Sequence, residues 1–137
     1  MMTTALDRVL VLTSYPPRVC GIATYTQDLV TALNRTFTGP YRYTVCALED
    51  GLVPRHYPSE VTHRLNTSDG EDHERLAMDV DHDPRIKSVW VQHEFGLYNG
   101  GQGQYLLQFL HAVNKPVAIT FHTELPEPSV DRKEMTS

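Results

Sequence analysis

The sequence predicts an α/β fold built on a doubly wound parallel sheet, and two patterns carry that prediction. Short apolar runs, typical of strands buried on both faces, alternate with segments whose apolar residues recur at helical spacing. Residues 8–33 contain such a strand, a Pro-Pro turn and a helix in direct succession. Strands separated by crossover helices run parallel, and right-handed crossovers lead most simply to the order 3-2-1-4-5.

The first strand is expected at residues 9–12, which form an unbroken apolar run. Residues 14–18, with two consecutive prolines, end it. The helix that follows opens near Gly21. Its inward positions at helical spacing are Ile22, Thr26, Leu29, Val30 and Leu33, which leaves Gln27, Asp28 and Thr31 for solvent.

The rest of the chain continues the alternation of strands and helices. Further strands are expected at residues 43–48, 61–65, 88–92 and 116–121. A short acidic helix is expected from residue 69 to residues 81–84, where a proline disfavours helix in the residue before it. A second helix, at residues 102–113, carries its apolar residues at Leu106, Phe109, Leu110 and Val113. Residues 50–60 form an exposed loop with a glycine and two prolines.

The composition is that of a single globular domain. A chain of 137 residues has room for one domain, expected here at residues 1–128 with a polar tail at 129–137. The net charge of -5 and the lack of a basic cluster argue against nucleic acid as a partner. No apolar run approaches the roughly 20 residues of a membrane span. With two cysteines and no signal-like N-terminus, a reducing, cytoplasmic location is expected.

Polar residues follow two of the expected strands and should meet beside the loop at Gly21, at one edge of the sheet. The fourth strand runs into Gln92, His93 and Glu94, and the fifth runs into His122. Because the strand order reverses between the first and fourth strands, the crevice there is where open α/β sheets bind ligands. The helix that begins near Gly21 has unpaired N–H groups and a dipole that favours an anion. This crevice is therefore a candidate phosphate site.

Three segments carry a family resemblance. They are residues 14–26 with Ser-Tyr-Pro-Pro and Cys-Gly-Ile-Ala-Thr-Tyr-Thr, residues 92–98 with Gln-His-Glu-Phe-Gly-Leu-Tyr, and residues 120–123 with Thr-Phe-His-Thr. In order and spacing they resemble the N-terminal domain of retaining glycosyltransferases of family 4, the group 1 type, which have the GT-B fold. The similarity runs over about residues 8–128. In that family two Rossmann-like domains face each other across a cleft, the first holding the acceptor and the second most of the nucleotide-sugar donor.

The resemblance implies a role at the donor diphosphate for the start of the first helix. Gly21 would let backbone N–H groups approach the diphosphate, and Ile22 begins the helix whose dipole faces it. Arg18, just before the helix, is placed to add a positive charge.

The resemblance also implies roles for residues at the other strand ends. His122 would be the catalytic residue beside the transferring sugar. Tyr15, His93 and Glu94 would line the acceptor side. The nucleotide sugar is expected as a substrate, with no metal and no other cofactor.

Members of this family need a second domain that supplies basic residues to the diphosphate and an acidic E-x7-E pair to the donor. Neither follows in this chain, so it is expected to form the incomplete N-terminal half of a GT-B architecture, inactive by itself. A fifth strand without a following helix would leave a sheet edge and part of an apolar face uncovered. Self-association or a partner chain at that edge is therefore expected.

Alternative interpretations stay open at this point. The chain could be a non-catalytic interaction module or an unrelated small phosphate binder, although it has neither G-x-G-x-x-G nor a P-loop. Gly21 could serve a tight turn or close helix packing, and His122 could be a strand-end histidine bonded to backbone. Cys20 could be a reactive thiol at a helix N-terminus or a packing residue. His93 and Glu94 lack the spacing of a metal motif. Five other histidines are expected on the surface: His56, His63, His73, His82 and His111.

Overall fold

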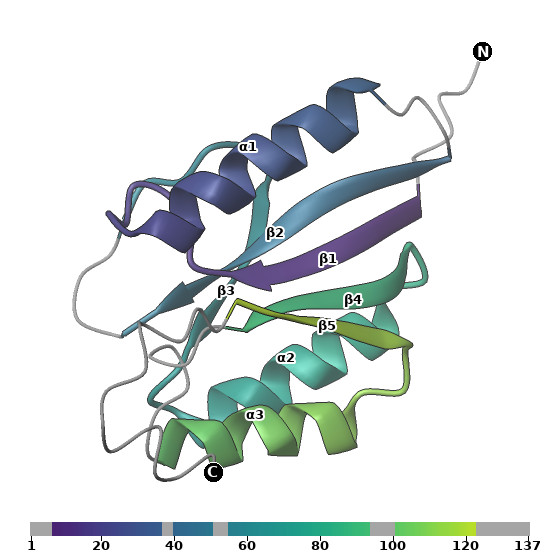
Figure 1. Ribbon diagram of the computed structural model, residues 1–137. Coiled ribbons are helices and arrows are strands. Elements are labelled where there is room, and N and C mark those ends of the chain that lie inside the picture. The colour runs from purple at the N-terminus through teal and green to yellow at the C-terminus, as the bar shows by residue number, and fades with distance from the viewer. Residues whose placement is uncertain (1–6, 37–39, 51–54, 94–100, 123–137) are drawn as a thin grey trace, which may run out of the picture.

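The computed structural model in Figure 1 describes residues 7–36, 40–50, 55–93 and 101–122. Within these ranges the strands are β1 (Asp7–Thr13), β2 (Tyr41–Glu49), β3 (Val61–Asn66), β4 (Ile86–His93) and β5 (Val117–Phe121). The helices are α1 (Gly21–Thr36), α2 (Gly70–His82) and α3 (Gly101–Ala112). Every predicted strand and helix is present, and the strand bounds differ from the predicted ones by no more than two residues.

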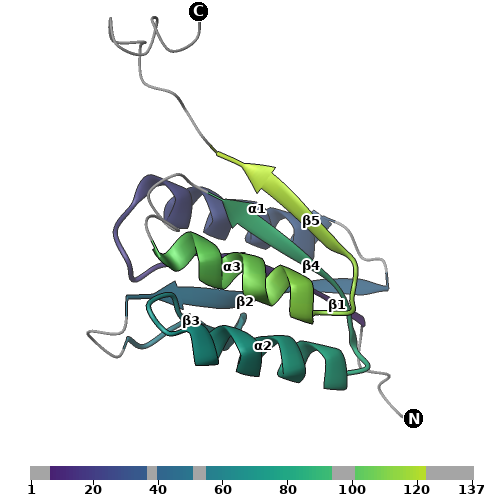
Figure 2. The same cartoon turned by 90° about the horizontal axis from the view of Figure 1, so that it is seen from below.

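The five strands form one parallel sheet in the order β3-β2-β1-β4-β5, which confirms the predicted topology and the Rossmann-like fold class. Helix α1 lies on one face of the sheet, and α2 and α3 lie side by side on the other (Figures 1 and 2). Because all strands are parallel, their carboxyl ends meet at one edge of the sheet.

Side chains of β1 alternate between two apolar clusters. Leu10 and Leu12 pack with Leu76 of α2 and Phe109 of α3. Val11, between them, belongs to the smaller cluster under α1. A strand with helices on both faces has no solvent-facing side, which explains the unbroken apolar run in the sequence.

The beginning of α2 corrects one prediction. His73 was expected at the surface, but its side chain is completely buried between α2 and α3. Its Nδ1 lies 2.7 Å from the carbonyl oxygen of Asp69, and its ring lies 5.5 Å from that of Tyr105. The charged residues around His73 in the sequence suggested a polar environment. In the helix those charged residues point toward solvent, whereas the side chain at position 73 faces α3.

Gly70, the first residue of α2, is required by the packing of α2 on α3. A Cβ atom there would lie 2.9 Å from Cε1 of Tyr105 and 3.0 Å from Cδ1. The first separation is shorter than real Cβ contacts and the second is tighter than nearly all of them, so the ring or the helix would have to move. Asp69 before it is the N-cap, and its side chain accepts hydrogen bonds from the backbone N–H groups of Glu71 and Asp72.

We predict that Gly70→Ala lowers the free energy of unfolding by about 1–3 kcal/mol, because it overpacks the contact with Tyr105. Urea denaturation measures the change. Gly21→Ala is the matched control, since Gly21 also begins a helix but a Cβ there meets no atom of the described residues within 4 Å. Adding Tyr105→Leu to Gly70→Ala should recover part of the loss. Equal effects of the two glycine substitutions would contradict the packing argument.

Candidate functional site

The ends of β4 and β5 and the first turns of α1 come together, as the sequence predicted. Strand β4 pairs with β5 so that His93 is opposite Phe121, and the backbone N–H of His122 donates to the carbonyl of His93 at 2.7 Å. The ring of His122 meets the ring of Tyr25, from α1, edge to face at 5.3 Å. Segments that are far apart in the sequence therefore share one place at the carboxyl edge of the sheet.

Gln92 fixes the orientation of His122. Its side chain is completely buried at the end of β4, and its Oε1 accepts a hydrogen bond from Nε2 of His122. In this arrangement Nε2 carries the proton, and Nδ1 is the ring nitrogen left for another partner. The motif contained Gln92, but it was not predicted as a site residue. A polar side chain at the end of an otherwise apolar strand was the available signal.

Two buried polar atoms at this edge have no hydrogen-bond partner among the described residues. They are Nε2 of Gln92 and Oγ of Ser14, and both side chains are fully buried. Ser14 follows β1, beside Thr13, whose hydroxyl donates to the carbonyl of Ser14 and lies 3.2 Å from that of Thr26 in α1. Buried donors usually have partners, so unpaired ones mark a place where a ligand can supply them.

The described part of the chain gives no packing reason for glycine at position 21. Gly21 is the exposed first residue of α1, its backbone is helical, and a Cβ atom would meet no described atom within 4 Å. The alternative that glycine serves close helix packing is therefore not supported. A ligand that approaches the backbone closely remains as a reason for glycine here.

The turn before α1 positions Arg18. The peptide bond between Pro16 and Pro17 is cis, and the N–H of Arg18 donates to the carbonyl of Tyr15 at 3.1 Å, the arrangement of a type VI turn. Arg18 is half-buried on this turn. Ile22, one residue into the helix, is buried, so it offers its backbone N–H to the site and its side chain to the core.

The structure buries Tyr15, which the resemblance assigned to the acceptor side. Its side chain is fully enclosed under α1, and its hydroxyl donates to Oε2 of Glu60 at 2.6 Å. Burial, together with this bond to a carboxylate, raises the pKa of Tyr15. Its hydroxyl is thus held by Glu60, away from the edge where His122 lies, and its role on the acceptor side stays a prediction.

His93 is half-buried, and its ring packs against that of Phe121 at 5.3 Å. Burial lowers the pKa of His93 below the ordinary value of 6.5. Glu94 lies outside the described residues. Cys20 is half-buried and packs against the cluster under α2 and α3, as its packing interpretation predicts.

The described residues contain no cluster of three or more His, Cys, Asp or Glu side chains that could hold a metal ion. In the same part of the chain, none of the helices has the length and apolar character needed to cross a membrane. A scan against protein-family models found no match, and neither did a search of curated proteins.

We predict that the protein loses stability when the pH falls from neutral through 6.5. The pKa values of His63 and His93 are lowered, in both cases chiefly by burial, so the folded state binds fewer protons than the unfolded state. The contribution of these two histidines to the free energy of unfolding is fully present above their pKa in the unfolded state. It is lost as the pH falls through their lower pKa values in the folded state. Urea denaturation at a series of pH values measures it. The double variant His63→Gln and His93→Gln should have a flatter profile, whereas His111→Gln, at an exposed position, should not.

Proposed function

We propose that the carboxyl edge of the sheet is the acceptor-side half of a glycosyl-transfer site that acts on a nucleotide sugar. The observation that carries this proposal is the meeting of the described parts of the three motif segments around His122, with Gly21 at a helix start where no described residue requires glycine. The family resemblance of those segments supplies the reaction type. A sheet edge at a topological switch point is where such a ligand binds.

The start of α1 would bind the diphosphate of the donor. Glycosyl transfer breaks the bond between the anomeric carbon and a diphosphate oxygen, so negative charge grows on the leaving group. The free N–H groups around Gly21 and Ile22, and the guanidinium of Arg18, would stabilise that charge. A side chain at position 21 would keep the diphosphate away from these N–H groups.

His122 would hold the sugar that is transferred. Gln92 occupies Nε2, which leaves Nδ1 as the acceptor for a sugar hydroxyl. The acceptor oxygen then forms its bond to the anomeric carbon, and its proton passes to the departing diphosphate. In this mechanism His122 orients the sugar and does not become covalently attached to it. His93 and Glu94 would contact the acceptor.

The remaining contacts to the donor would come from a second domain or chain, so this polypeptide by itself would bind the nucleotide sugar weakly and transfer little or nothing. An open half-site leaves most of the ligand in water, which weakens every electrostatic interaction in it.

We predict that a nucleotide sugar such as a uridine diphosphate hexose binds at millimolar affinity. It should shift the amide NMR signals of Gly21, Ile22 and His122. Gly21→Val should abolish the shifts by blocking the approach to the backbone, and His122→Ala should weaken binding about tenfold by removing a buried hydrogen bond.

The control for a valine in the same helix is Ala32→Val, at an exposed position of α1. It should leave binding unchanged. A folded chain in which no concentration of nucleotide or nucleotide sugar shifts these signals would overturn the proposal and favour a non-catalytic interaction module.

The uncovered side of β5 is the proposed contact for self-association. On the α1 side, an apolar groove of about 330 Å³ is lined by Val9, Tyr43, Trp90, Val117 and Ala118, among others. Phe121, at the end of the same strand, is 68% exposed. Strand β5 is also an edge of the sheet, so its outer backbone groups can pair with a second β5.

We predict that the chain forms dimers at micromolar to millimolar concentration, measured by sedimentation equilibrium. Ala118→Lys should shift the equilibrium to monomer, because it places a charge on the exposed face of β5. Ala112→Lys puts the same charge on an exposed position of α3 and should have no effect. A stable monomer at every concentration would contradict self-association.

A further inference from the structure

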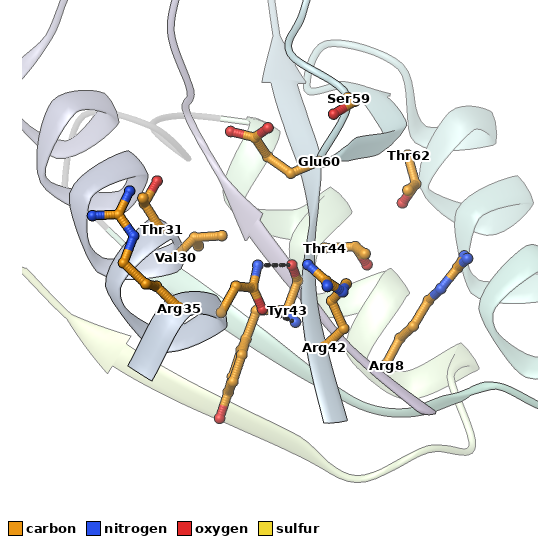
Figure 3. A pocket seen from close by; sticks show the side chains of 11 residues that line it. Arg8, Val30, Thr31, Arg35, Arg42, Tyr43, Thr44, Ser59, Glu60 and Thr62 are labelled. Atoms are coloured by element: carbon orange, nitrogen blue, oxygen red, sulfur yellow. Dashed lines mark hydrogen bonds between the residues drawn. The ribbon is translucent and has the colours of Figure 1, made fainter. Parts of the chain in front are cut away.

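A concave surface lies at the amino end of the sheet, opposite the carboxyl edge where His122 lies. It is a groove of about 470 Å³ beside the first residues of β2 (Figure 3). Strand β3 begins opposite Val45, so residues 41–44 of β2 have β1 on one side and none of the described strands on the other. The side-chain amide of Asn34, from α1, replaces the missing strand by hydrogen bonding to both the N–H and the carbonyl of Tyr43.

The groove is positively charged although the chain as a whole is acidic. Arg8, Arg35 and Arg42 line it, against a single acidic residue, Glu60. The Oε2 atom of Glu60 is engaged by the hydroxyl of Tyr15. Within the described residues, none of the three guanidinium groups has an ion pair or a side-chain hydrogen bond, and the ion pairs of this part all belong to Arg75. The other lining residues are mainly small and polar, with hydroxyl groups on Thr31, Thr44, Ser59 and Thr62.

Two of the arginines are held directly opposite each other. In the pairing of β1 with β2, Arg8 is in register with Arg42, so both side chains extend from the same face of the sheet. Figure 3 shows them on one side of β2, with Arg35 on the other. Like charges at opposed positions of neighbouring strands repel and destabilise the pairing. An anion between them would turn that repulsion into attraction.

A hydroxyl at the base of the groove is a second, independent indication of a ligand. The side chain of Thr44 is only 5% exposed and lies two residues from Arg42, on the same face of β2. Its Oγ1 has no hydrogen-bond partner among the described residues. A buried hydroxyl without a partner costs free energy that a bound oxyanion would recover.

We propose that this groove binds a phosphate group, held between the guanidinium groups of Arg8 and Arg42 with the hydroxyl of Thr44 as an additional donor. Guanidinium groups match the oxygens of a tetrahedral oxyanion in geometry as well as charge. The site lies at the amino end of the strands, away from His122, and does not depend on the glycosyl-transfer proposal. The ligand is a small phosphorylated molecule or free phosphate.

The test is a titration of the full chain with inorganic phosphate at constant ionic strength, with chloride as the balancing salt, followed by amide NMR shifts and by thermal denaturation. Phosphate should shift the signals of Arg8, Arg42 and Thr44 in a saturable way and raise the Tm. Arg42→Gln should weaken this binding at least about tenfold, the effect of losing a charge-assisted hydrogen bond. Arg8→Gln should weaken phosphate binding to the same extent, and it provides the test if Arg42→Gln fails to fold.

Without phosphate, Arg42→Gln should be no less stable than the unsubstituted protein, since the opposed charge is gone. Arg64→Gln is the matched control, because it removes the same charge from an exposed position of β3 that does not line the groove. Equal responses to chloride and phosphate, an equal loss in Arg64→Gln, or shifts confined to the start of α1 would each overturn the proposal. The last outcome would contradict this proposal but not the proposed site at Gly21.

A second titration with a phosphate monoester separates the two sources of the ligand. Tighter binding than inorganic phosphate assigns the groove to phosphorylated molecules, and weaker binding assigns it to free phosphate.

Discussion

The parallel pairing of β1 with β2 on one side and β4 on the other is the constraint on which the rest of the molecule depends. Both faces of β1 are covered by helices, and Leu10, Val11 and Leu12 are all fully buried, so a slip of the strand by one residue would move each side chain into the opposite apolar cluster and disrupt the packing of both. With this register fixed, the carboxyl ends of all five strands lie at one edge and their amino ends at the other. Both candidate sites are consequences of that polarity.

The sequence was sufficient for the fold because burial on both faces produces a simple signal. Unbroken apolar runs for strands and helical spacing for α1 and α3 are visible without knowledge of the neighbours. The sequence also predicted that His93 and His122 lie close together, because parallel topology alone brings the ends of their strands to the same edge of the sheet. Such inferences need only the direction and order of the strands.

The parts that could not be predicted depend on which side chains face each other. The sequence suggested a surface position for His73, which α3 covers in the structure. It also suggested that Tyr15 is available to a ligand, but its hydroxyl donates a hydrogen bond to Glu60, 45 residues later. Gln92 was within a motif, but its bond to His122 needs the register of β4 with β5. The opposition of Arg8 and Arg42 likewise depends on the register of β1 with β2. No local pattern contains this information.

The two glycines that begin helices differ in how far the described packing explains them. Gly70 is explained completely by its neighbours, because Tyr105 leaves no room for a Cβ atom. Gly21 has the same position in its helix and an ordinary backbone conformation, and among the described residues no atom lies within 4 Å of where its Cβ would be. Glycine lowers helix stability by about 0.5–1 kcal/mol relative to alanine in the middle of a helix, and the cost is smaller at the first residue, where Gly21 stands. Under the proposal, a ligand supplies the reason for glycine here: at a helix start with unpaired N–H groups, in the helix whose Tyr25 contacts His122, an anion is the ligand that fits.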